Sequence, residues 1–155
     1  MRKEFERMEK ILTKEFGKNR KMYLATSSQN VPKVQLVNTF YWDRSFYVVT
    51  HESSELMQNF MKNNKVSLTT TASFHKFQGE AVHMGHPLKE ENTAIRDVFK
   101  EVLSDWYVDN CDESDAKLCF VQIKINTGFT YASKIGYNVD FGTNELESFR
   151  FAPHS

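Results

Sequence analysis

The stretch KVQLVNTFYWDRSFYVV, residues 33–49, decides the fold. It contains two runs rich in β-branched and aromatic residues, 33–42 and 46–49, with only residues 43–45 between them. So short a connection can join antiparallel strands, whereas parallel strands need a crossover of about a dozen residues or more. The stretch therefore predicts a β-hairpin.

Similar patterns continue on both sides of this hairpin. Further strands are expected at residues 22–27, 65–73, 77–85, 118–126 and 128–133, the last two as a second hairpin. Apolar residues at helical spacing predict helices at 3–16, 54–62 and 91–106, and the segment after Gly136 shows no clear period. Most strands follow one another through short turns, and closing at least six of them into a barrel leaves no exposed edge. We expect an α+β fold, a predominantly antiparallel β-barrel with flanking helices, in one domain spanning residues 1–155.

The charge composition limits the class of partner. Lys and Arg together number 20, and Asp and Glu also number 20, so the formal net charge is zero. Proteins that bind nucleic acids usually carry a basic excess, so no nucleic-acid partner is expected. No apolar run approaches the length of a membrane span, and the charged start MRKEFERMEKIL lacks the apolar core of a secretory signal. The two cysteines, Cys111 and Cys119, show no metal-binding or redox spacing, which suits a cytoplasmic protein.

The motifs of common enzyme classes are absent from the sequence. The six glycines are scattered and form no phosphate-binding loop, and neither a nucleophile elbow nor a helical zinc-protease signature occurs. His83 and His86 are three residues apart, which places them on opposite faces of a strand. We therefore expect no metal site, and the residues alone identify no catalytic group.

The segment THESSEL, residues 50–56, joins the hairpin to a helix with almost no linker. The start of a helix attracts anions because its free N–H groups and its dipole favour negative charge. The hydroxyls here could therefore contact a phosphate, or Ser53 could serve only as the helix cap. Glu55, in the first turn of the helix, opposes a bound anion.

Lys33 and Gln35 share one face of the second strand, because side chains alternate along a strand. If that face meets the helix start, the site combines a cation, an amide and hydroxyls, which is a composition that binds phosphate. The other interpretation is that Lys33 lies on the outside of the barrel.

Several features of residues 20–87 occur together in the order of a known family. They are Ala25-Thr26 on the first strand, Pro32 at the start of the second, Tyr47 with Thr50 on the third, Asn63 with Lys65-Val66 after the short helix, and Gly79-Glu80-Ala81 on a later strand. In this outline the sequence resembles the pyridoxamine 5′-phosphate oxidase-like family, the FMN-binding split barrels, whose members include flavin oxidoreductases and nitroimidazole-resistance-like proteins.

The resemblance implies a split β-barrel homodimer that binds FMN in a groove between its subunits and uses it to oxidise or reduce a small molecule. The cofactor-binding residues it implies are Lys33 and Gln35 on the second strand and Thr50, His51, Ser53 and Ser54 at the helix start. Gln35 stands where the family commonly has Arg, and Ser54 and Glu55 stand where it commonly has lysines. These departures leave an alternative open, in which the barrel is a ligand-binding or interaction protein with haem, a deazaflavin or no cofactor. On composition alone, His51 could also be only an exposed loop residue.

Overall fold

The computed structural model describes residues 2–153, which form four α-helices and one eight-stranded sheet. The helices are α1 (Arg2–Phe16), α2 (Glu55–Lys62), α3 (Thr93–Leu103) and α4 (Asp105–Asn110), with a 3₁₀ turn η1 at Glu90–Asn92. The strands are β1 (Arg20–Ser28), β2 (Val31–Trp42), β3 (Ser45–His51), β4 (Lys65–Thr70), β5 (Lys76–Gly85), β6 (Leu118–Ala132), β7 (Ile135–Asp140) and β8 (Glu145–Arg150). Within the described range, no helix combines the length and the apolar character that crossing a membrane requires.

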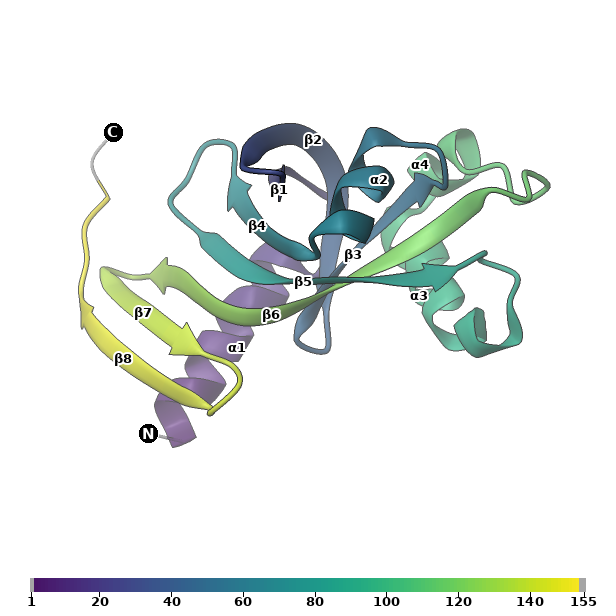
Figure 1. The fold of residues 1–155 in the computed structure, drawn as a ribbon. Helices are drawn as coiled ribbons and strands as arrows, with labels where there is room; N and C mark the ends of the chain where they lie inside the picture. Colours follow the sequence, from purple (N-terminus) through teal and green to yellow (C-terminus); the bar gives the residue numbers. More distant parts are fainter. Residues whose placement is uncertain (1, 154–155) are drawn as a thin grey trace.

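Six of the strands close into a barrel (Figure 1). Their order is β3-β2-β1-β4-β5-β6, and the pairing of β3 with β6 completes the circle. Every pair of neighbouring strands is antiparallel. β7 and β8 extend the sheet beyond β6, and α1 packs against β6, β2 and β8. The predicted antiparallel barrel with flanking helices is therefore confirmed.

The barrel is split between β2 and β3. These strands pair only next to their connecting turn, from Phe40 opposite Tyr47 to Trp42 opposite Ser45. The first half of β2 pairs with β1 alone. Helix α2 packs against β1 and β3 and is held to β1 by Asn59 Nδ2, which donates a hydrogen bond of 3.3 Å to Thr26 Oγ1. The split brings the start of α2 close to the first half of β2.

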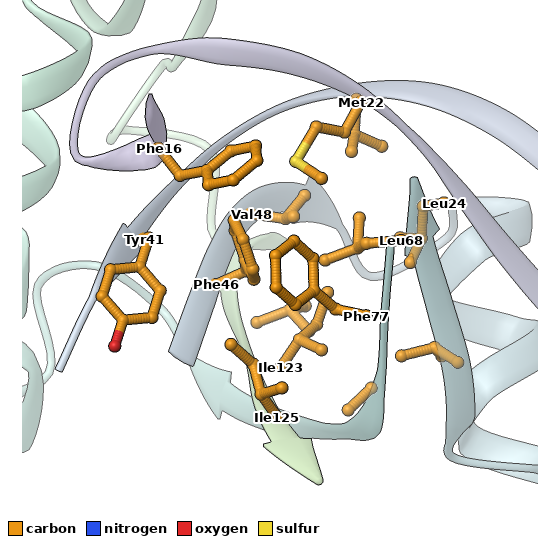
Figure 2. Close-up of a cluster of buried hydrophobic side chains, with 14 of the residues drawn as sticks. Phe16, Met22, Leu24, Tyr41, Phe46, Val48, Leu68, Phe77, Ile123 and Ile125 are labelled. Atoms are coloured by element: carbon orange, nitrogen blue, oxygen red, sulfur yellow. The ribbon is translucent and has the colours of Figure 1, made fainter. Parts of the chain in front are cut away.

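Aromatic rings pack among aliphatic side chains in the core (Figure 2), as the 13 phenylalanines suggest. Phe16 at the end of α1 contacts Phe46 of β3 and Phe77 of β5 edge-on, with ring centroids 5.6 and 5.4 Å apart. A second cluster joins α3 to the outside of the barrel, where Phe99 stacks on Phe120 of β6 at 3.9 Å. Such geometries favour aromatic pairs beyond their buried area. The two clusters fix α1 and α3 against the barrel.

The main difference from the sequence prediction concerns β6, which is one continuous strand and not a hairpin. Gly128, at the predicted junction, lies inside the strand, and a Cβ there would come within 2.5 Å of Phe77 Cδ1. The glycine therefore permits a close approach of an aromatic ring and does not mark a turn. The turn follows at Ser133 and Lys134, whose φ values of 51° and 66° suit a two-residue hairpin loop.

Two further elements depart from the prediction. The expected helix at 91–106 is divided, because Ser104 has a φ of 48° and separates α3 from α4. The segment after Gly136 forms β7 and β8, and its Phe141 packs edge-on against Phe5 of α1 at 6.3 Å. This segment thus covers the chain's own helix.

Candidate functional site

The junction between β3 and α2 is held by hydroxyl groups. Ser54 Oγ accepts hydrogen bonds from the backbone N–H of Met57 at 3.1 Å and from Thr50 Oγ1 at 2.9 Å. Ser54 is therefore the residue that caps α2, and the interpretation of Ser53 as the cap is wrong. Because both acceptor positions of the Ser54 hydroxyl are in use, its own hydrogen remains as a donor for a ligand.

His51 is fixed in orientation by contacts at both ring nitrogens. The backbone N–H of Ser53 donates to Nδ1 at 3.2 Å, and Ser53 Oγ lies 2.7 Å from the same nitrogen. Since Nδ1 accepts, the hydrogen of a neutral ring must lie on Nε2. Nε2 is 3.1 Å from Asp115 Oδ2, in the loop before β6. His51 thus bridges β3 to that loop.

The same arrangement recurs at His83 and His86. In each, Nδ1 accepts the backbone N–H located two residues further along the chain, at 2.9 and 3.1 Å. Nε2 of His83 then donates to Glu52 Oε1 at 2.8 Å, and Nε2 of His86 donates to the carbonyl oxygen of Asp115 at 3.0 Å. All three histidines around the junction therefore present a hydrogen, and not a lone pair, at Nε2.

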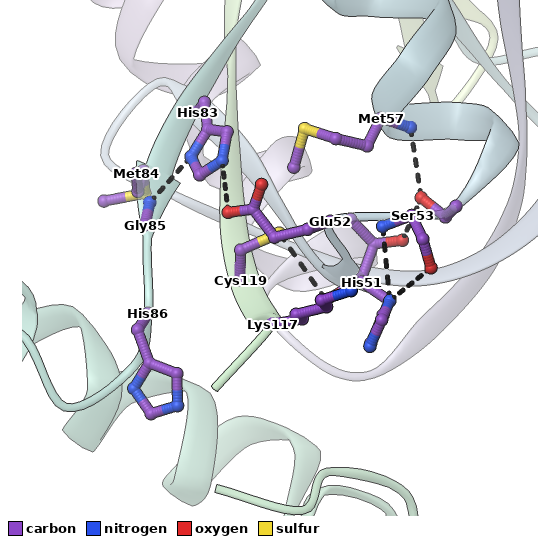
Figure 3. Close-up of polar contacts among 12 residues, drawn as sticks. His51, Glu52, Ser53, Met57, His83, Met84, Gly85, His86, Lys117 and Cys119 are labelled. Carbon is purple, nitrogen blue, oxygen red and sulfur yellow. Dashed lines mark hydrogen bonds and ion pairs between the residues drawn. The ribbon is translucent and has the colours of Figure 1, made fainter. Parts of the chain in front are cut away.

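Glu52, His83 and Cys119 lie close enough to suggest a metal site (Figure 3), because one ligand atom of each falls within 4.8 Å of the others. A metal needs a bare imidazole nitrogen and a thiolate. Here His83 Nε2 carries a hydrogen, and Cys119 Sγ points to the carbonyl of Thr50 at 3.6 Å. Burial, and to a smaller extent the charge of Glu52, raise the pKa of the Cys119 thiol to about 12. The donor set does not fit a metal ion.

Lys33 reaches the same junction from β2. Its ammonium lies 3.4 Å from Glu55 Oε1, in the first turn of α2. Lys33 lies opposite Thr26 and Gln35 opposite Leu24, so both side chains belong to the face of β2 that turns toward the split. The sequence predicts a phosphate-binding composition only if the Lys33 face of β2 meets the start of α2. The contact between Lys33 and Glu55 shows that it does. Gln35 is an exposed residue further along that face.

A surface hollow of about 310 Å³ opens at the start of β2, and Lys33, His51 and Ser54 are not among the residues that line it. Thr26 and Pro32 line it, together with Lys65 and Val66 of β4. Ligand pockets commonly have volumes of about 300 Å³ or more, so the hollow has room for part of a small molecule.

Sequence reasoning did not assign Asp115, Glu52 or His83 to the junction. Asp115 follows a run of acidic and small residues, Asp112-Glu113-Ser114, which resembles an ordinary exposed loop. It reaches His51 only because β3 pairs with β6, with His51 opposite Leu118. No local sequence pattern predicts the contact between His51 and Asp115.

Three solved structures show which folds this chain resembles. A NimC/NimA family protein from Clostridium acetobutylicum aligns with a TM-score of 0.59 and 18% identity over 92% of this chain and 93% of its own. A pyridoxamine 5′-phosphate oxidase-related, FMN-binding protein from Nostoc punctiforme aligns with a TM-score of 0.56 and 9% identity, covering 86% and 88%. HutZ, the haem storage protein of Vibrio cholerae, aligns with a TM-score of 0.60 and 14% identity, covering 78% and 89%.

Identities this low support a shared fold and leave the ligand open. No family model matches the sequence, and no curated protein matches it. The alignments nevertheless span most of both chains in each comparison. The resemblance seen in the sequence is confirmed at the level of the fold: this chain has the split-barrel architecture of the pyridoxamine 5′-phosphate oxidase-like proteins.

Proposed function

We propose that this chain is an FMN-binding protein and acts as a flavin-dependent oxidoreductase of small molecules. The observation that carries the proposal is the position of Lys33, whose ammonium lies at the start of α2 because the barrel is split there. A cation, a hydroxyl hydrogen and the start of a helix then lie at one junction, and these are groups that can bind a phosphate monoester.

Each residue of the junction has a distinct task in this proposal. Lys33 neutralises phosphate charge, and Ser54 donates its free hydroxyl hydrogen to a phosphate or ribityl oxygen. His51 Nε2–H is a further donor once it leaves Asp115. Thr50 and Ser53 act by holding Ser54 and His51 in place. The flavin ring, when bound, supplies the electron transfer, so the protein needs no dedicated acid or base.

We also propose that the protein is a homodimer and that the partner subunit covers the cofactor. The outer face of β1 and β2 carries Tyr23, Val34 and Leu36, which are 43%, 64% and 49% exposed. Neighbouring apolar side chains exposed to this degree mark interaction surfaces. Sedimentation at micromolar concentration should show a dimer, and Leu36→Glu should shift it toward monomer.

The proposed compartment is the cytoplasm. Cys111 and Cys119 are both buried and unpaired, which suits a reducing environment. The proposed partners are a second copy of the chain and a small-molecule substrate or reductant.

The test of FMN binding is the visible spectrum of the purified protein, before and after incubation with FMN and desalting. Retained flavin bands are the expected result. Lys33→Glu should lower the FMN affinity by about tenfold or more, because it replaces an attractive charge with a repulsive one. Lys134→Glu makes the same charge change in the turn after β6 and serves as the matched control. If Lys33→Glu retains FMN as tightly as Lys134→Glu, Lys33 does not hold the phosphate.

A second candidate is a split barrel that holds haem, a deazaflavin or no cofactor. Two carboxylates at the junction favour it, because Glu55 faces Lys33 and Asp115 faces His51. The structural likeness to HutZ, a haem storage protein, adds a reason to test haem. A protein that takes up haem and ignores FMN would replace the first proposal with this one.

A further inference from the structure

We propose that Glu55 and Asp115 are specificity-determining residues, because each of these carboxylates already pairs with a group proposed to bind the phosphate, Lys33 or His51. They weaken the preference of the site for a phosphorylated flavin over an uncharged one. This inference rests on the proposed flavin binding, and it predicts which flavin the site accepts.

Lys33 and His51, the two side chains proposed to meet the phosphate charge, each already have an anionic partner. Lys33 Nζ lies 3.4 Å from Glu55 Oε1, and His51 Nε2 lies 3.1 Å from Asp115 Oδ2. A phosphate that reached either donor would have to replace a carboxylate and then remain close to its negative charge. The gain from binding the phosphate dianion is offset by this repulsion, whereas a ribityl hydroxyl meets no such penalty.

The two carboxylates differ in how easily they can move away. The side chain of Glu55 is 64% exposed, so it can rotate into solvent when Lys33 binds another anion. Asp115 is held more firmly, because its Oδ1 accepts the N–H of Lys117 at 2.9 Å. Its carbonyl oxygen also accepts hydrogen bonds from His86 at 3.0 Å and from the N–H of Leu118 at 3.1 Å. Asp115 must therefore be the stronger determinant.

Removing the charge should convert the junction into a better phosphate site. Asp115→Asn keeps the size of the side chain and one oxygen that can accept from His51, but it gives up the contact with the N–H of Lys117 and removes one negative charge. We expect it to raise the affinity for FMN about tenfold, and Glu55→Gln to raise it about threefold, while the affinity for riboflavin stays the same.

The experiment is a titration of flavin fluorescence with each protein, using FMN and riboflavin as the two probes. The unmodified protein should bind both within about fivefold of each other, and Asp115→Asn should widen the ratio in favour of FMN. Asp112→Asn is the matched control, because Asp112 lies in the same loop and its Oδ1 accepts the N–H of Ser114 at 3.0 Å. It removes the same charge and a similar loop contact without touching His51.

A parent protein that binds FMN more than about a hundredfold tighter than riboflavin would overturn the inference and leave FMN binding standing. A ratio that Asp115→Asn leaves unchanged, or that Asp112→Asn changes equally, would also overturn it.

If neither the parent nor any variant binds a flavin, the proposed function is refuted. The role of the two carboxylates is then tested separately by titration with inorganic phosphate. Phosphate should shift the backbone amide resonances of Ser53 and Ser54 in a Glu55→Gln, Asp115→Asn double variant and not in the parent. Absence of that shift in the double variant would refute the role of the two carboxylates.

Discussion

Nδ1 of His51 accepts the N–H of Ser53 at 3.2 Å, while Nε2 of the same ring faces Asp115 Oδ2 at 3.1 Å. The short turn after β3 thus places the hydrogen of His51 on Nε2. Asp115, in a loop far along the chain, accepts a hydrogen bond from it. His83 and His86 repeat the first half of this arrangement with the N–H groups of Gly85 and Leu88. The polar surroundings of the junction are therefore organised around three Nε2–H donors.

This organisation predicts the state of the three rings. When neutral, His51, His83 and His86 should all carry their hydrogen on Nε2, which long-range proton–nitrogen correlation spectra measure directly. Titration with Zn²⁺ should show no saturable binding, because Nε2 of His83 has no free lone pair. A spectrum showing the hydrogen of His83 on Nδ1 would contradict the assignment and make a metal site with Glu52 and Cys119 credible again.

The two serines of the junction should differ in their effect on stability. Ser54→Ala removes the acceptor of both the Met57 N–H and the Thr50 hydroxyl, so the free energy of unfolding should fall by about 1 kcal/mol. Ser53→Ala keeps the backbone N–H that holds His51, so it should change the free energy of unfolding by less than about 0.5 kcal/mol. Urea unfolding measures both variants. Equal losses would show that Ser53 shares the capping role.

The sequence predicts the barrel better than the site. Short turns between apolar runs allow only antiparallel pairing, so the hairpin of β2 and β3 follows from local patterns. Gly128 misleads because a glycine required for a close contact with Phe77 looks the same as a glycine required for a turn. The pairing of Lys33 with Glu55 was within reach of sequence reasoning, which considered that the Lys33 face of β2 could meet the helix start that carries Glu55. Asp115 was not, because its contact depends on the pairing of distant strands.

His75 should make the protein less stable in mild acid. The ring is 3% exposed, lies 2.7 Å from Thr130 Oγ1 through Nδ1 and stacks on Tyr131 at 4.5 Å. Burial is the main cause that lowers the pKa of His75 from 6.5 to about 4. Between pH 6.5 and about 4, His75 is therefore protonated in the unfolded chain but neutral in the folded chain. The free energy of unfolding falls as the pH drops through this window.

The total loss should approach about 3 kcal/mol below pH 4, since a tenfold change in proton affinity corresponds to about 1.4 kcal/mol. Urea unfolding from pH 7.5 to pH 4 measures this slope. His75→Phe keeps an aromatic ring at the position and cannot titrate, so its slope in this window should be smaller than that of the parent. Identical slopes would show that other groups cause the acid sensitivity.

The loop that carries Asp115 should depend on Glu113. Arg96 donates to both carboxylate oxygens of Glu113 at 2.6 and 2.7 Å, and the Tyr107 hydroxyl donates to Oε2 at 2.7 Å. Chiefly through Arg96, these contacts lower the pKa of Glu113 from 4.5 to about 2. Their stabilisation is present above pH 4.5 and is lost as the pH falls through about 2.

Glu113→Gln should lower the free energy of unfolding by about 2 kcal/mol, because it leaves the partly buried Arg96 without its charged partner. Tyr107→Phe removes one hydrogen bond and should cost about 1 kcal/mol. Hydrogen exchange at the N–H of Asp115 and of Leu118, which close the turns of this loop, reports the local effect. Exchange should accelerate more in Glu113→Gln than in Tyr107→Phe. If Glu113→Gln leaves both N–H groups as protected as in the parent, the ion pair stabilises α3 and α4 without positioning Asp115.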